Sequence, residues 1–183
     1  MQGKGRAYGA EFYFKKTKGK LNGWISYTYS RTLRQVVGLS NDKWYPSKYD
    51  RPSNLAVVVN YDFNKRWNIS ANFVYISGTP NTFPDSKIEI QGYTVNYNTS
   101  NMRNNYRNPS YNRLDFSATY NFKKNDKRRW QSSIVFSVYN SYARKNAFAV
   151  YFQATPNQPS QTQAIKYSVV GTIIPAITYN FKF

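Results

Sequence analysis

Large apolar and small polar side chains alternate along several stretches of the chain. One such stretch covers residues 114–122, where the apolar positions are Leu114, Phe116, Ala118, Tyr120 and Phe122. The residues between them are Asp115, Ser117, Thr119 and Asn121. Alternation with a period of two is typical of β-strands that present one apolar face. The pattern therefore predicts an all-β protein.

The same alternation predicts seven antiparallel strands. They cover residues 6–14, 21–31, 54–63, 67–77, 113–122, 130–140 and 167–183. The short connections between them are basic and cover residues 15–20, 64–66 and 123–129. The long connections are polar, are expected to lack regular structure, and cover residues 32–53, 78–112 and 141–166. Pro175 removes one backbone donor from the last strand, so a sheet edge or a bulge is expected there.

Short turns that alternate with long loops are typical of bacterial outer-membrane barrels. The polar strand faces carry mainly Ser, Thr, Asn and Gln, which suits a wet barrel interior better than the outside of a soluble sandwich. No apolar run approaches the roughly 20 residues that a spanning helix needs. The predicted fold is therefore a transmembrane antiparallel β-barrel.

The direction of the strands indicates an incomplete barrel. If the short turns are periplasmic, the first strand starts on the outer side of the membrane. Complete single-chain barrels have an even number of strands and start in the periplasm. We therefore expect residues 1–183 to be a C-terminal segment of about seven strands, with the plug and the N-terminal strands absent.

The chain is strongly basic, with 26 Lys and Arg against 8 Asp and Glu and a net charge of +18. Basic patches mixed with aromatics are usual in nucleic-acid-binding proteins, so a soluble nucleic-acid-binding β-domain is one alternative. Here, however, many cations fall at the predicted short turns, which suits the headgroup zone of an anionic membrane. These residues are Lys15, Lys16, Lys18, Lys20, Lys65, Arg66, Lys123, Lys124, Lys127, Arg128 and Arg129.

Residues for catalysis and metal binding are scarce. The chain has neither Cys nor His, which removes thiolate ligands and the commonest general base. We find no nucleophile constellation, paired carboxylates or phosphate loop, so we expect no enzymatic activity, metal or cofactor. The pairs Asp50–Arg51 and Arg113–Asp115 are interpreted as local ion pairs that order a loop base or the barrel wall. Ligand binding by these pairs is the alternative.

Aromatic residues make up 19% of the chain. Three of them fall at short-turn ends, where barrels carry an interfacial girdle: Trp67, Phe122 and Trp130. The longest loop combines Tyr with many Asn, a composition that suits ligand contact. The ligand-contact candidates are Tyr93, Tyr97 and Tyr106. Packing of this loop against its neighbours explains the same tyrosines equally well.

Seven segments carry a resemblance to a known family. They are GKGRAYGAEFYFKK from Gly3, LNGWISYTYSRT from Leu21, YDRPSNLAVVVNY from Tyr49, SGTPNTFP from Ser77, RNPSYNRLDFSATYNF from Arg107, VYNSYARKNAFAVYF from Val138 and IIPAITYNFKF from Ile173. In order and spacing they resemble the C-terminal part of Bacteroidetes-type TonB-dependent outer-membrane receptors, which often carry a carboxypeptidase-like regulatory domain. The chain departs from that pattern at Pro52 and Ser53, where the family more often has Arg-His.

The resemblance implies a barrel of about 22 strands with a plug, located in the outer membrane of a Gram-negative bacterium. Such receptors import nutrients with energy that TonB relays from the inner membrane. The implied partners are outer-membrane lipid and lipopolysaccharide, the barrel assembly machinery, the TonB system through the missing N-terminal part, and a surface lipoprotein. Nucleic acid is not among them. A passive porin-like or surface-structural barrel is the alternative within the same membrane class.

The end of the chain resembles the C-terminal signal that the barrel assembly machinery reads. The residues of this signal are Ile177, Tyr179, Phe181 and Phe183. An amphipathic strand with an unpaired edge and an aromatic end can pair with a strand of the machinery.

We expect Phe183→Asp to impair insertion of the complete receptor, because it places a charge on the signal at the apolar boundary. The measurement is the amount of surface-exposed, heat-modifiable receptor in the outer membrane. Termini of soluble domains usually fray and tolerate such changes. A normal amount of inserted receptor would therefore contradict the proposed signal.

Overall fold

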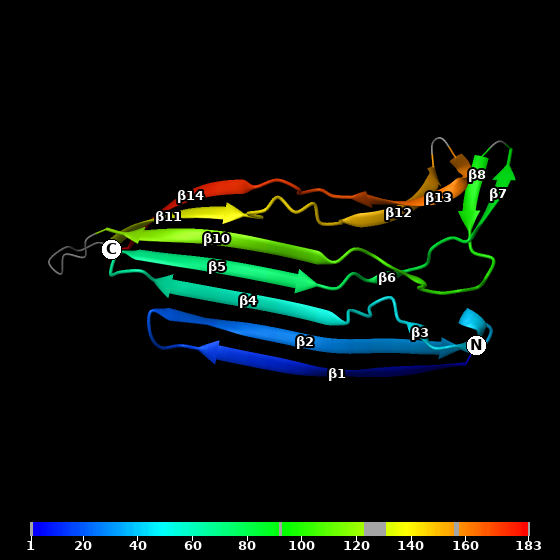
Figure 1. Ribbon diagram of the computed structural model, residues 1–183, viewed down its shortest axis with the longest axis horizontal. Coiled ribbons are helices and arrows are strands. Elements are labelled where there is room, and N and C mark those ends of the chain that lie inside the picture. Colours follow the sequence, from blue (N-terminus) through cyan, green and yellow to red (C-terminus); the bar gives the residue numbers. More distant parts are fainter. Residues whose placement is uncertain (1, 92, 123–130, 156–157, 183) are drawn as a thin grey trace.

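One antiparallel sheet forms most of the molecule (Figure 1). The computed structural model describes residues 2–91, 93–122, 131–155 and 158–182. The long strands follow one another across the sheet in chain order. They are β1 (Gly3–Lys16), β2 (Leu21–Val36), β4 (Ser53–Asp62), β5 (Trp67–Ile76), β10 (Tyr111–Asn121), β11 (Gln131–Tyr139) and β14 (Ile174–Lys182). The short β3 (Tyr45–Pro46) pairs with the outer end of β2.

These seven long strands confirm the predicted all-β antiparallel fold. Their ends agree with the predicted ends to within a few residues, except at β2 and β14. Strand β2 continues five residues past Arg31 to Val36, because Gly3 to Ala7 of β1 supply backbone partners for this extension. Backbone pairing needs no apolar side chain, so alternation does not mark where it stops.

The predicted last strand, residues 167–183, is wrong at its start. Tyr167 instead ends β13 (Gln158–Tyr167), which pairs with β12 (Ala149–Thr155) in a separate hairpin. Strand β14 starts at Ile174, opposite Tyr139. Pro175 lies in β14 opposite Val138, in an unbroken register at the edge of the sheet, so the expected edge position is confirmed and the expected bulge is not formed.

The register keeps side chains of one kind on one face of the sheet. Directly opposed residues of antiparallel strands point to the same side. One row across the sheet is Leu21, Tyr61, Ile69, Ala118, Phe136 and Ile177. The adjacent row, on the other side, is Asn22, Asn60, Ser70, Ser117, Ser137 and Ala176. We call these sides the apolar face and the polar face.

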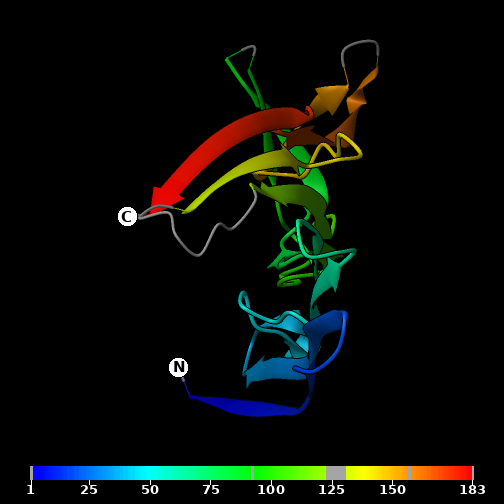
Figure 2. The same ribbon diagram turned by 90° about the vertical axis from the view of Figure 1, so that its left-hand side faces the viewer.

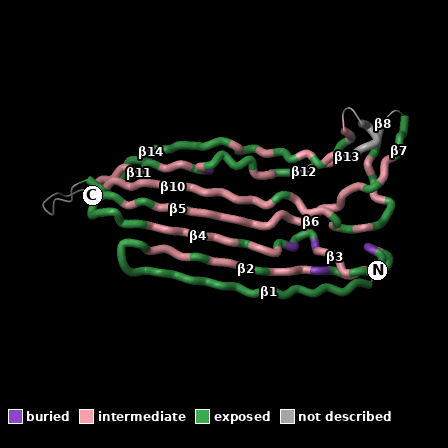
Figure 3. Tube along the Cα trace, viewed as in Figure 1, coloured by how far each residue is buried: buried purple, intermediate pink, exposed green. Residues whose placement is uncertain are grey.

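The apolar face has no covering layer in the described part of the chain. Phe116 is 44% exposed and Ile177 is 70% exposed, and Leu33 is the buried hydrophobic residue among the described ones. Figure 3 shows intermediate or exposed residues along nearly the whole length of the strands. A β-sandwich would bury one face against a second sheet. The described part of the chain therefore has a single main sheet with two open faces and not the two packed layers of a sandwich.

The sheet curves into an open arc, with β1 and β14 at its two ends (Figure 2). In the described residues these two strands are not paired with each other, so the barrel is not closed. Strand β1 begins at the end that carries the long connections, and β14 ends at the opposite end, as the strand directions predicted (Figure 1). We call these the loop end and the turn end.

Polar side chains on the polar face bond to one another across strands. Asn60 Nδ2 donates to Asn22 Oδ1 at 3.2 Å, and Ser70 Oγ donates to Asn60 Oδ1 at 2.7 Å. Trp24 also lies on this face, and its ring centroid is 6.2 Å from that of Tyr13. A face of this kind suits a wet barrel interior.

Aromatic side chains form a line of ring contacts on the apolar face at the turn end. The ring centroids of Trp67 and Tyr120 lie 4.9 Å apart, those of Tyr120 and Phe122 5.3 Å, and those of Phe122 and Tyr179 6.4 Å. This line is the girdle predicted from Trp67 and Phe122. The third predicted member, Trp130, lies outside the described residues, as does the basic turn 123–129.

No helix in the described part of the chain is both long enough and apolar enough to cross a membrane.

The two faces predict opposite responses to a charge. Phe116→Arg should destabilise the receptor in phosphatidylcholine vesicles by about 2–4 kcal/mol, the cost of a cation on a lipid-facing midplane position. Ser117→Arg, one residue away on the polar face, is the matched control and should cost little. Guanidinium unfolding in vesicles measures both. Equal losses would contradict the assignment of the faces.

Candidate functional site

The long connections lie at the loop end and contain regular structure that the polar composition of these segments did not predict. The connection 78–112 contains β6 (Pro80–Asn81), β7 (Ser86–Ile90), β8 (Tyr93–Tyr97) and β9 (Tyr106–Arg107). The connection 141–166 contains β12 and most of β13. Hairpins pair their own backbone groups without support from the barrel wall. The expectation that these connections lack regular structure is therefore wrong.

Asp50 is the centre of a buried ion-pair network at the base of these connections. The residue is 0% exposed, and its Oδ2 accepts from Arg107 Nη2 at 2.6 Å. Its Oδ1 accepts from Arg31 Nε at 3.3 Å and from the backbone N–H of Thr32 at 2.7 Å. Both carboxylate oxygens are thus satisfied by donors from separate parts of the chain, as a buried charge requires.

The partners of Asp50 differ from the expected ones. The sequence suggested Arg51, but that side chain is exposed, and the described ion pairs of Asp50 are to Arg31 and Arg107. Arg31 lies in β2 and Arg107 in β9, so both partners of Asp50 are distant from it in sequence. The expected role, ordering of a loop base, is nonetheless the one the geometry supports.

Arg107 fixes two connections at once. Its Nη1 donates to the carbonyl of Asp50 at 2.8 Å and to the carbonyl of Gly78 at 2.7 Å. Gly78 allows this close passage, because a Cβ at that position would collide with the backbone carbonyl of Asn108. Arg107 lies 57 residues from Asp50 along the chain, and no sequence motif marks it as the partner.

Further bonds join the connection 37–52 to the connection 78–112. Asn104 Nδ2 donates to the carbonyl of Pro46 at 2.7 Å, and the N–H of Arg103 donates to Ser40 Oγ at 2.9 Å. The N–H of Ser40 in turn donates to the carbonyl of Asn101 at 3.1 Å. The two connections are therefore bonded into one unit at the loop end of β2, β4 and β5.

Arg113 is the centre of a second cluster, on the polar face near the loop end. Its Nε donates to Asp115 Oδ2 at 2.9 Å, which confirms the pair expected from the sequence. Its Nη1 donates to the hydroxyls of Tyr111 at 3.0 Å and Tyr139 at 2.8 Å, and the guanidinium lies 4.2 Å from the centre of the Tyr139 ring. Asp115 Oδ1 also accepts from the N–H of Asn140 at 2.9 Å.

A cavity of about 280 Å³ lies beside this cluster. It is lined by Arg51, Tyr111 and Phe148 together with residues 76–79. A second cavity of about 190 Å³ shares Tyr111 and Phe148 and adds Arg113. Phe148 is 77% exposed, so its ring is accessible to a ligand from the solvent. The two cavities thus combine two guanidinium groups with aromatic rings, a lining suited to a ring-bearing polar or anionic ligand.

The three candidate tyrosines occupy different surroundings. Tyr106 packs against Phe83 and Phe152, with ring centroids 5.9 and 6.0 Å away. Tyr97 is 41% exposed on the hairpin β7–β8. Tyr93 lies at the start of β8, and its side chain is outside the described part of the structure. Tyr106 therefore joins two connections, because Phe152 belongs to β12, and ligand contact by all three tyrosines stays a prediction.

Asp85 holds the base of the hairpin β7–β8. Its carboxylate accepts from the N–H of Thr99 at 2.8 Å and from the N–H of Ser100 at 3.0 Å. The Ser100 hydroxyl, together with these two N–H donors, holds the pKa of Asp85 well below its usual value. The lowered pKa keeps this carboxylate ionised in mild acid, so the anchor does not depend on pH there.

The assembly-signal residues lie on the edge strand. Ile177, Tyr179 and Phe181 lie in β14 on the apolar face and are 59–70% exposed. Phe183 lies outside the described residues. One side of β14 pairs with β11, and its other side has no strand partner among the described residues.

No group of three or more Asp, Glu, His or Cys that could hold a metal occurs in the part of the chain that the structure describes. An open arc with an exposed apolar face on one side, a polar face on the other and loops gathered at one end is the architecture of an outer-membrane barrel wall.

Comparison with known families agrees with this class. The family described as TonB dependent receptor-like, beta-barrel, matches residues 2–141. The match covers more than half of the chain, so the chain belongs to this family. Its members are transporters and receptors of the outer membrane that work with the TonB system. No curated protein and no solved structure matches the chain.

We expect Asp50→Asn to loosen the loop end, because the neutral amide leaves two guanidinium groups without their counter-charge. Breaking a buried pair from one side costs about 3 kcal/mol or more, and the partial exposure of both arginines points to the low end. Trypsin should then cut faster at Lys43 and Lys48, which lie in the connection that Asp50 holds. Asp62→Asn, at the turn end, is the control, and equal cleavage of the two variants would contradict the clamp.

Proposed function

We propose that the chain is the C-terminal part of the barrel of a TonB-dependent transporter that takes up a nutrient. The finer assignment is to the Bacteroidetes-type receptors with a carboxypeptidase-like regulatory domain. The observation that carries the proposal is the family match together with the two-faced open sheet. The remaining strands and the plug would belong to the rest of a longer receptor.

The distribution of side chains supports a location in the outer membrane of a Gram-negative bacterium. An apolar face that stays exposed across seven strands exceeds what a soluble monomer tolerates. The polar face carries cross-strand bonds such as Asn60 to Asn22, as a water-filled interior requires. A nucleic-acid-binding surface would instead gather its cations on one groove or face.

The loop end is the proposed place of nutrient contact. The Asp50 network fixes the loops there, and the cavity lined by Arg51, Tyr111 and Phe148 opens beside it. Tyr97 adds an exposed ring on the neighbouring hairpin. Loops held by buried ion pairs present their side chains in defined positions, which lowers the entropic cost of binding. The arrangement suits binding and release, and no step of covalent chemistry is part of it.

Replacing Tyr93, Tyr97 and Tyr106 together with Ala should lower nutrient uptake several-fold in cells that carry the complete receptor, without lowering its amount in the membrane. Loss of aromatic contact area at the loops is the physical reason. Uptake is measured in cells with and without TonB. Uptake that is independent of TonB would favour the passive-barrel alternative.

Phe83→Ala is the matched control for this experiment. Phe83 contacts Tyr106 and also Phe152, so its removal loosens the same aromatic cluster without removing a candidate tyrosine. An equal fall in uptake for Phe83→Ala would show that the tyrosines act through packing of the loops. Unchanged uptake in the triple variant would remove them from the binding site.

A further inference from the structure

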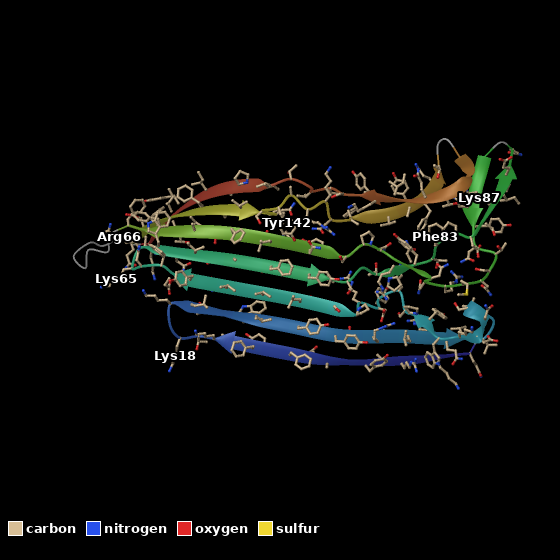
Figure 4. The ribbon with its side chains drawn as sticks, viewed as in Figure 1. Lys18, Lys65, Arg66, Phe83, Lys87 and Tyr142 are labelled. Atoms are coloured by element: carbon tan, nitrogen blue, oxygen red, sulfur yellow. The ribbon has the colours of Figure 1, made fainter. Side chains whose placement is uncertain are left out.

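The turn end carries a cluster of exposed cations on two neighbouring turns. We call this cluster the basic rim, which consists of Lys15, Lys16, Lys18, Lys20, Lys65 and Arg66, all exposed. Lys15 and Lys16 end β1, and Lys18 and Lys20 lie in its connection to β2. Lys65 and Arg66 lie in the connection of β4 to β5. Figure 4 shows Lys18, Lys65 and Arg66 together at this end of the sheet.

Backbone bonds hold the two turns side by side. The N–H of Asp62, at the end of β4, donates to the carbonyl of Lys20 at 2.8 Å. The N–H of Asn121 in β10 donates to the carbonyl of Arg66 at 2.8 Å. Inside the second turn, Asn64 Oδ1 accepts from the N–H of Arg66 at 2.8 Å. The cations are therefore displayed from ordered turns rather than from free chain ends.

The rim is not neutralised within the described part of the chain. The ion pairs there join Asp50 and Asp115 to arginines on the side of the loop end. Asp62 lies beside the rim, but its carboxylate accepts from Asn68 Nδ2 at 2.8 Å. Like charges at this density repel one another, and an anionic partner relieves that repulsion.

The rim borders the aromatic girdle on the apolar face. Phe14 directly precedes Lys15 and is 67% exposed, and Trp67 directly follows Arg66. Girdle aromatics lie at the depth of the lipid headgroups. The ammonium and guanidinium groups beside them are therefore at the depth of lipid phosphates, where each basic residue adds attraction to an anionic surface.

We propose that the basic rim binds the phosphate groups of anionic phospholipids in the leaflet that faces the short turns. This inference rests on the membrane location in the proposed function. A membrane of anionic phospholipid matches both features of this end of the sheet. Its interfacial region accommodates the girdle aromatics, and its phosphate groups provide a dense layer of negative charge for the cations. A soluble acidic protein or a nucleic acid would match the charge but not the adjoining apolar band.

The test measures lipid enrichment at the turn itself. The chain contains no cysteine, so Thr17→Cys adds one attachment point to it for a fluorophore between Lys16 and Lys18. Cysteines elsewhere in the complete receptor are first replaced by Ser. The receptor is reconstituted in phosphatidylcholine vesicles with trace nitroxide-headgroup phosphatidylglycerol or nitroxide-headgroup phosphatidylcholine. We expect phosphatidylglycerol to quench at least threefold more strongly, with the excess lost in 0.5 M NaCl.

Four neutralising changes at the rim should remove this preference: Lys18→Gln, Lys20→Gln, Lys65→Gln and Arg66→Gln. Quenching by phosphatidylcholine should stay as in the unchanged receptor, which shows that the variant is inserted. The matched control removes four exposed lysines at the loop end and should keep the preference. Its changes are Lys43→Gln, Lys48→Gln, Lys145→Gln and Lys166→Gln.

The outcomes separate this inference from the proposed function. No quenching by either lipid would place the turn away from a membrane and would contradict the function itself. Equal quenching by both lipids, with no effect of salt, would overturn the rim as a phospholipid site and leave the membrane location intact. If the rim variant does not insert, the unchanged receptor still tests the inference. Its preference for phosphatidylglycerol must then disappear in 0.5 M NaCl, and a preference that salt does not change would overturn the rim as a phospholipid site.

Discussion

The continuous backbone pairing from β1 to β14 is the constraint on which the rest of this structure depends. In a bilayer, backbone N–H and C=O groups have no water to bond to, so they must pair within the protein. The register that achieves this also aligns Ile69 with Ala118 and Ser70 with Ser117. A slip of one residue in any strand would turn its apolar side chains toward the interior.

Backbone and side-chain polar groups at the loop end must also be hydrogen-bonded, but the regular backbone pairing of the long strands stops there. Buried side chains replace it: Asp50 accepts from Arg31 and Arg107, and Asn140 bonds to the carbonyls of Arg144 and Thr172. The carboxylate of Asp50 and the side-chain amide of Asn140 thus supply hydrogen bonds that a neighbouring strand would otherwise supply. The turn end needs no such device, since its turns are short, and its cations stay available for an external partner.

Much of the fold could be predicted from alternation alone, because burial of one face against lipid imposes a period of two on each spanning strand. The loop end could not. Nothing local distinguishes Arg107 from the other arginines of the loops, and its partner Asp50 lies 57 residues away. The same reason applies to Tyr106, whose contact with Phe152 depends on how β9 and the separate hairpin β12–β13 meet.

The sequence by itself determined the number of long strands in the barrel wall, the face of each side chain on them and the end at which each connection lies, because these follow from periods and lengths that are local. Tertiary structure decided which strand Tyr167 joins, which arginines neutralise Asp50 and how far β2 continues past Arg31. Each of these depends on a partner distant in sequence, and only the folded chain sets which distant groups come within bonding distance.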